Sequence, residues 1–142
     1  MLSTIARDPE GFPYGSLVTI AIDGVGRPLL LLSKLAEHTG NLLARSESSI
    51  LIAEPGEASA DPLSVGRVTI LGLVTAVPVE ERASVRETFL AANPAARAYV
   101  DFADFAFYRL EPSALRYVGG FGRMSWVTAE DYRAAAPREV QG

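Results

Sequence analysis

The sequence predicts a mainly β protein with short peripheral helices (α+β), arranged as an antiparallel barrel. The first observation behind this prediction is a series of about six segments rich in apolar and β-branched residues, most of which follow one another without an intervening helix. The second is the absence of regularly alternating strands and helices, which argues against a doubly wound parallel sheet. Consecutive strands pair most simply as antiparallel neighbours, so a barrel with helices around it is favoured.

Three strands and one helix are predicted in the first half of the chain. Residues 15–22 (GSLVTIAI) are rich in β-branched residues, and the glycines of DGVG at residues 23–26 favour a turn. The strand that returns from this turn covers residues 28–32, and a third strand covers residues 48–53 (SSILIA). A short helix is predicted over residues 37–45, between the second and third strands.

A long strand, further helices and a closing strand are predicted in the second half. The long strand covers residues 67–77 (RVTILGLVTAV), and Gly72 within it marks a bend, a bulge or the close approach of another group. Apolar residues at i, i+4 and i+7 predict a helix over residues 80–92. Pro112 and the glycine pair at residues 119–120 are expected to interrupt the strands around them. The remaining elements are a helix at residues 94–102, a strand at residues 105–110, a strand over residues 116–118 and 121–127 that is broken by the glycine pair, and a helix at residues 129–136.

Length and composition favour a single domain over residues 1–142. Hydrophobic residues make up 49% of the chain, which is enough for a sizeable core and too many for a disordered protein. The net charge of −4 provides no basic field to hold nucleic acid. The chain has no cysteine, which excludes disulfides, thiolate metal sites and cysteine nucleophiles and is consistent with a reducing cytoplasm.

The sequence also predicts a cytoplasmic protein without a membrane anchor. Charges and glycines interrupt the apolar runs, so no transmembrane helix is predicted. Residues 1–10 carry Arg7, Asp8 and Glu10 and lack the apolar stretch of a signal peptide. We expect this segment and residues 137–142 to be flexible.

The strand-to-helix junction around residue 33 carries the strongest functional signal. Free backbone N–H groups and the helix dipole favour an anion at such a junction. The side chains that add hydrogen-bond donors there are Ser33, Lys34, His38 and Thr39. On residue types alone, a solvated turn with ordinary helix-capping residues is the favoured interpretation, because Ser and Thr are common caps.

Residue types elsewhere point to no acid–base or metal chemistry. His38 is the only histidine, which excludes a multi-histidine site, and no spacing of Asp and Glu suggests a carboxylate site, so no metal is predicted. A Ser-His-Asp triad would need His38, but no glycine-flanked serine elbow is present. The catalytic residues are therefore unassigned. The aromatic residues expected in the core are Phe102, Phe105, Phe107 and Tyr108.

Several segments, in order along nearly the whole chain, are similar to one family. They are GSLV at residues 15–18, LLLSKLAEHTGNL at 30–42, DPL at 61–63 with RVTILG at 67–72, DFADFAFYRLEP at 101–112 and YVGGFG at 117–122. Together they resemble the FMN-binding split-barrel proteins related to pyridoxamine 5′-phosphate oxidase, and within them the haem-utilisation branch. The resemblance implies an antiparallel split β-barrel.

An FMN-binding homodimer, acting as a small oxidoreductase on an unidentified small molecule, is what this resemblance implies. The turn after the second strand would hold the phosphate, which reverses the interpretation of the junction as a plain solvated turn. The partner subunit would cover the flavin ring. The residues assigned to the cofactor by resemblance are Ser33, Lys34, His38 and Thr39 at the turn, with Ser16, Arg67, Gly120, Phe121 and Gly122 elsewhere.

Some of these residues also have simpler interpretations. Arg67 is either a water-facing arginine at the start of a strand or a partner for phosphate or flavin carbonyls. Gly120 and Gly122 either allow a bulge or bend or let the backbone approach a flat ring, near which Phe121 or Trp126 would pack.

Two alternatives to a flavoprotein remain on the same fold. One is a haem-binding or haem-degrading protein in which His38 or an arginine at the dimer groove contacts the haem, and the other is a cofactor-free binding module. Haem-utilisation relatives often carry a further C-terminal domain, which is not expected here, so FMN is the first expectation. The turn has fewer arginines and lysines than the pyridoxamine oxidase branch, so oxidation of pyridoxamine phosphate itself is not expected. Neither nucleic acid nor membrane is an expected partner.

Overall fold

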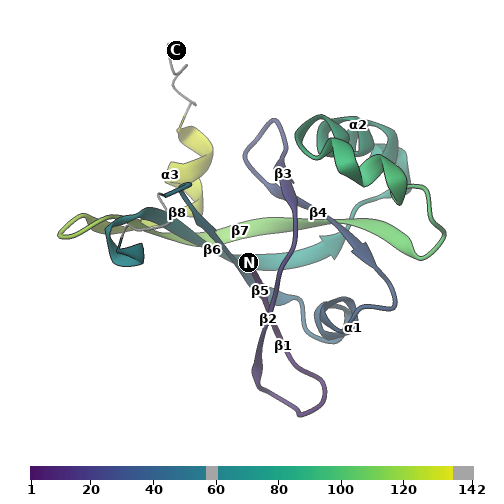
Figure 1. Ribbon diagram of the computed structural model, residues 1–142, viewed down its shortest axis with the longest axis horizontal. Coiled ribbons are helices and arrows are strands. Elements are labelled where there is room, and N and C mark those ends of the chain that lie inside the picture. The colour runs from purple at the N-terminus through teal and green to yellow at the C-terminus, as the bar shows by residue number, and fades with distance from the viewer. Residues whose placement is uncertain (57–60, 136–142) are drawn as a thin grey trace.

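The computed structural model describes residues 1–56 and 61–135. Within these residues, eight strands form one antiparallel sheet in the order β2-β1-β5-β6-β7-β4-β3, with β8 paired to β7 (Figure 1). The predicted antiparallel, mainly β fold is therefore confirmed. The strands are β1 (Leu2–Ile5), β2 (Pro13–Ser16), β3 (Ile20–Ile22), β4 (Pro28–Ser33), β5 (Glu47–Ala53), β6 (Gly66–Ala76), β7 (Phe105–Gly119) and β8 (Met124–Thr128).

The helices lie at the periphery of the sheet, as the sequence predicts. Figure 1 shows α1 beside β1, α2 over β3 and β4, and α3 next to β7 and β8. No helix in the described ranges is long and apolar enough to cross a membrane. The helices are α1 (Glu37–Ala44), α2 (Arg82–Ala92) and α3 (Ala129–Ala134), with 3₁₀ turns η1 (Pro62–Ser64), η2 (Val79–Glu81) and η3 (Pro94–Ala98).

The N-terminal segment differs from its prediction. Residues 2–5 form β1, which pairs with both β2 and β5, and Leu2 is fully buried opposite Ile50. The expectation of a flexible segment was therefore wrong for these residues, because pairing with two strands satisfies their backbone groups. Residues 137–142, also expected to be flexible, lie outside the described residues.

The strand predicted over residues 15–22 is split in two. It divides into β2 and β3, and residues 17–19 between them leave the sheet. This break matters for function, because the same three residues line a cavity.

The strand β7 runs through Pro112, which was expected to interrupt it. The register of β6 against β7 shifts between Leu71 and Gly72, opposite this proline, and such a bulge accommodates a residue that lacks an N–H donor. A Cβ atom on Gly72 would collide with the backbone carbonyl of Glu111. Of the three alternatives predicted for this glycine, the structure therefore shows both the bulge and the close approach. The strand predicted over residues 121–127 begins only at Met124, after a hairpin turn.

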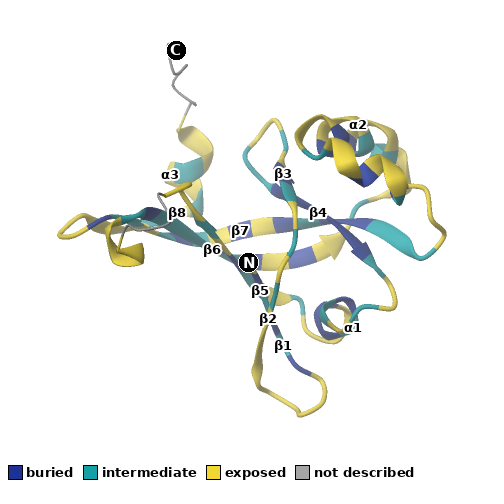
Figure 2. Ribbon diagram, in the orientation of Figure 1, coloured by how far each residue is buried: buried dark blue, intermediate teal, exposed yellow. Residues whose placement is uncertain are grey.

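The run of leucines in β4 is buried on both faces (Figure 2). Leu30 and Leu32 pack into one hydrophobic cluster with β1, β5, β6 and β7, while Leu29 and Leu31 pack into a second cluster beneath α2. Alternating side chains of a strand point to opposite faces, so a continuous apolar run is what a doubly covered strand requires. This arrangement fixes the end of β4, where the candidate site begins.

Candidate functional site

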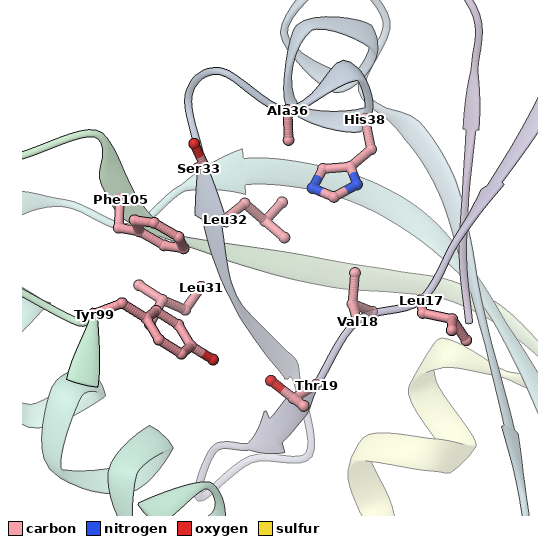
Figure 3. A pocket seen from close by; sticks show the side chains of 10 residues that line it. All are labelled: Leu17, Val18, Thr19, Leu31, Leu32, Ser33, Ala36, His38, Tyr99 and Phe105. Atoms are coloured by element: carbon pink, nitrogen blue, oxygen red, sulfur yellow. The ribbon is translucent and has the colours of Figure 1, made fainter. Parts of the chain in front are cut away.

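A cavity of about 460 Å³ opens beside the end of β4 (Figure 3). Its size is within the range of about 300–1,000 Å³ that is usual for small-molecule sites. The lining residues are Leu17, Val18, Thr19, Leu31, Leu32, Ser33, Ala36, His38, Tyr99 and Phe105. Most of them are apolar, and none is charged when the imidazole of His38 is neutral.

His38 projects from the first turn of α1 toward this cavity (Figure 3). Burial removes part of the hydration of its imidazole, which lowers the pKa of His38 below its ordinary value of 6.5. The ring is therefore neutral at pH 7 and keeps one nitrogen lone pair for a hydrogen bond or a metal ion. No group of three or more metal-binding side chains occurs in the part of the chain that the structure describes, so His38 offers a single ligand.

Two buried polar side chains fix α1 below His38. The amide Nδ2 of Asn41 donates to Thr4 Oγ1 at 3.1 Å, and Asn41 Oδ1 accepts from the backbone N–H of Arg7 at 3.1 Å. Thr39 donates from Oγ1 to the carbonyl of Ser33 at 2.6 Å. Both Asn41 and Thr39 are 0% exposed, so these bonds tie α1 to β1 and to the end of β4.

The hydroxyl of Ser33 is already engaged within the protein. It donates to Asp104 Oδ2 at 2.7 Å and accepts from the backbone N–H of Leu35 at 3.1 Å. The backbone N–H of Lys34 donates to the carbonyl of Asp104 at 2.7 Å. The turn is thus held together by its own contacts, and the hydroxyl of Ser33 is already bound to a carboxylate.

The structure separates the four residues predicted to surround a phosphate. Ser33 and His38 line the cavity, whereas the side chain of Thr39 is buried beneath it and Lys34 is exposed outside the lining. The missing cation and the nearby Asp104 make this a poor fit for a phosphate, whose charge needs donors or cations around it. The apolar walls and neutral imidazole fit a flat, mostly apolar group with a metal centre better.

Among the other predicted residues, only Ser16 lies near the cavity. It precedes the lining residue Leu17, and its Oγ is buried without a hydrogen-bond partner among the described residues. Arg67 instead donates to the carbonyls of Leu63 and Val65 at 3.3 and 3.2 Å.

Residues 120–122 lie in the turn between β7 and β8. Gly120 and Gly122 have φ angles of +94° and +77°, which favour glycine, so both are accounted for as turn residues. Phe121 is 73% exposed.

The two groups of predicted residues lie at opposite ends of β7. Ser33 pairs with Phe105 at its start, and Arg67 pairs with Val118 near its end. Strand residues are spaced by about 3.3 Å, so these ends are roughly 40 Å apart. One chain alone therefore does not bring residues 120–122 to the cavity.

Sequence reasoning missed most of the cavity wall. Phe105 was assigned to the core, yet it lines the cavity and packs its ring 5.0 Å from that of Tyr99. Residues 17–19 were expected inside a strand. The alternating pattern of residues 17–19 carries no local signal for the break in the strand. The cavity lining is assembled from segments far apart in the sequence, so local patterns do not reveal it.

The comparison with protein families identifies the family of the chain. The family described as CREG β-barrel matches residues 1–134. The chain belongs to the CREG β-barrel family.

This CREG β-barrel chain is similar to two proteins whose names refer to haem. It is 42% identical over 139 residues to the chloroplastic non-canonical heme oxygenase HOZ of Arabidopsis thaliana, covering 95% of this chain and 42% of that protein. It is 39% identical to a heme binding protein from Mycobacterium smegmatis, with a TM-score of 0.86 over 94% of this chain and 53% of that chain. The chain thus spans only about half of these relatives, or less.

A third comparison concerns the fold alone. A Clostridium acetobutylicum protein of the pyridoxinephosphate oxidase family is 12% identical, with a TM-score of 0.67 over 93% of this chain and 86% of that one. The predicted resemblance to split-barrel proteins near the haem-utilisation branch is therefore confirmed. FMN, the cofactor expected first from the sequence, is not shown by these comparisons.

Proposed function

We propose that this protein binds haem in the cavity beside β4, with His38 as the side chain that contacts the iron. The observation that carries the proposal is the position of the only histidine, neutral and directed into an apolar cavity. A neutral imidazole is a common protein ligand of haem iron. The names of two relatives, at 42% and 39% identity, support the same ligand.

The chain's own residues provide the binding environment. Leu31, Leu32 and Phe105 supply apolar walls that would pack against a flat ring and exclude water from it. Thr39 and Asn41 hold α1, and therefore His38, in a fixed position. Bound haem would supply redox and oxygen chemistry at its iron, with these residues setting access and polarity.

Haem degradation is a second candidate activity. It is favoured by the relative named as a non-canonical heme oxygenase, which matches 95% of this chain. The loss of the haem absorbance in the presence of a reductant and oxygen, with retention in the protein-free control, is the measurement that separates degradation from binding.

We propose further that the functional unit is a homodimer. Leu17 at the cavity is 90% exposed, and Leu35 beside it is 86% exposed. At the other end of the molecule, the β7–β8 hairpin extends beyond the rest of the sheet and exposes Phe121, Met124 and Trp126 by 73, 59 and 63% (Figure 1). A second chain packed against these side chains would remove their apolar surface from water.

A symmetric pairing could also reconcile the two distant groups of predicted residues. The hairpin of one chain would cover the cavity of the other, so that residues 120–122 approach His38 across the interface. Light scattering at micromolar concentration should give the dimer mass for the wild type and a smaller mass for Phe121→Glu. A monomeric wild type would contradict the proposal.

A haemin titration of the purified protein tests the haem proposal. The wild type should develop a Soret band with one haem per chain, and His38→Ala should shift that band and weaken binding by tenfold or more. Lys34→Ala serves as a matched control, because Lys34 lies outside the lining of the cavity. Added imidazole should restore the wild-type spectrum to His38→Ala.

The same preparation distinguishes FMN, the alternative cofactor. If FMN, and not haemin, binds with micromolar affinity, and Lys34→Ala weakens that binding, the haem proposal is wrong and the phosphate turn is restored. Binding of neither cofactor would favour a cofactor-free binding module.

A further inference from the structure

Two hydroxyl groups meet at the end of the cavity that lies away from His38. Tyr99 and Thr19 both line the cavity, and Figure 3 shows their oxygens pointing toward one another across it. Among the described residues, neither hydroxyl has a hydrogen-bond partner, so the two are farther apart than a direct bond. Each hydroxyl is therefore free to donate a hydrogen bond to an acceptor atom of a ligand in the cavity.

The phenol of Tyr99 is held in place by its surroundings. Its ring packs against Phe105 with a centroid separation of 5.0 Å. Its backbone N–H donates to the carbonyl of Ala96 at 3.1 Å, and its carbonyl accepts from the N–H of Phe102 at 3.0 Å. A hydroxyl on a fixed ring can recognise a ligand atom with little loss of side-chain freedom.

We propose that Tyr99 and Thr19 form a carboxylate subsite that orients the ligand in the cavity. This inference rests on the proposed haem function, because haem is an apolar disc with its carboxylates on one edge. His38 would hold the centre of the disc, and the two hydroxyls would donate hydrogen bonds to a carboxylate at that edge. No Asp or Glu lines the cavity, so nothing there repels this anion.

The energetic reason for this subsite is the apolar character of the remaining walls. A carboxylate loses hydration on entering such a cavity and needs donors in compensation. Hydrogen bonds to a charged group are stronger than those between neutral groups, so two hydroxyls aimed at one place select strongly for it. A ligand of the same shape with esterified carboxylates would offer the hydroxyls only neutral carbonyl oxygens, which accept weaker hydrogen bonds.

The test compares haemin with its dimethyl ester, which keeps the ring and the iron but masks both carboxylates. The wild type should bind haemin about tenfold more tightly than the ester, the effect of one charge-assisted hydrogen bond. Tyr99→Phe and Thr19→Val should each reduce this ratio to about threefold or less, with the Soret maximum unchanged. Tyr14→Phe, which makes the same change on β2 outside the cavity lining, should keep the wild-type ratio.

The outcomes separate the two proposals. Equal binding of haemin and ester by the wild type, or an unchanged ratio in both cavity variants, would overturn the subsite while a Soret band still supported haem binding. The absence of a Soret band with either compound would refute the haem proposal, and the subsite with it. A ratio that falls equally in Tyr14→Phe would also count against the subsite.

Discussion

Replacing Asn41 with Ala tests whether α1, and with it His38, is held by buried hydrogen bonds. The substitution removes two contacts of 3.1 Å, one with Thr4 Oγ1 and one with the backbone N–H of Arg7. It also leaves the Thr4 hydroxyl without this partner, and Thr4 is only 1% exposed. The fold should survive, but α1 should lose its attachment to β1.

The size of the effect can be worked out from these contacts. Each hydrogen bond contributes about 1 kcal/mol net, and a buried group left without a partner costs about a further 1–3 kcal/mol. The bond from the backbone N–H of Arg7 is only partly buried, so water can replace part of it. We therefore expect a loss of about 3 kcal/mol in the free energy of unfolding, equivalent to roughly 10 °C in Tm for a chain of this length.

Urea and thermal denaturation of the apo protein measure this loss. Thr4→Val removes one of the two contacts with little change of shape and should cost about half as much. The double variant should lose less than the sum of the single losses, because Thr4 and Asn41 contact each other directly. Stability of Asn41→Ala within about 0.5 kcal/mol of wild type, with unchanged haemin affinity, would refute the idea that this amide positions α1.

Three further predictions concern pH and the turn glycines. Burial opposes ionisation of Asp23, but hydrogen bonds from the backbone and guanidinium of Arg27 and from the backbone of Val25 outweigh it and lower the pKa of Asp23. Its stabilisation is therefore present above about pH 4 and lost as pH falls through the folded-state pKa, and acid titration of Asp23→Asn should lack this step. Burial lowers the pKa of His38, so its imidazole stays neutral at pH 7. The affinity for haemin should therefore fall only as the pH drops below 6.5. If the affinity does not change down to about pH 4, His38 is excluded as the side chain that contacts the iron. Gly120→Val forces a φ of +94° on a branched residue and should cost about 1 kcal/mol or more in apo stability, whereas a loss of haemin binding alone would show that residue 120 faces the ligand.

The sequence identified what local patterns encode. The unbroken apolar run of β4 predicts a strand, and the isolated glycine of β6 marks the bulge at Gly72. Both patterns can be recognised from residues that are adjacent in the sequence. By contrast, β1 is only four residues long, and its order comes from pairing with β5 across the chain. No local pattern predicts such long-range pairing.

The candidate site shows the same division. His38 was singled out at a strand-to-helix junction because a lone histidine beside hydroxyls is visible in the sequence, and the structure places it in the lining of the cavity. The direction of Thr39 was not predicted, although α1 begins at Glu37 as expected, because it depends on how α1 packs against β1 and β6. The opposite wall, including Tyr99, is brought to the cavity by the packing of η3, which sequence spacing does not encode.

The charge distribution of the cavity gives the physical basis for preferring haem over FMN. A phosphate carries close to two negative charges, and placing it against apolar walls requires cations or several donors in compensation. The lining has no arginine or lysine, and the hydroxyl of Ser33 at the turn already donates to Asp104. The hydroxyls of Tyr99 and Thr19 lie at the other end of the cavity, away from that turn. A haem ring needs apolar contact over most of its area and one lone pair at its centre, which Leu31, Leu32 and the neutral His38 can provide. The same residues that weaken a phosphate site therefore strengthen a haem site, and a single cavity is not expected to serve both ligands equally well.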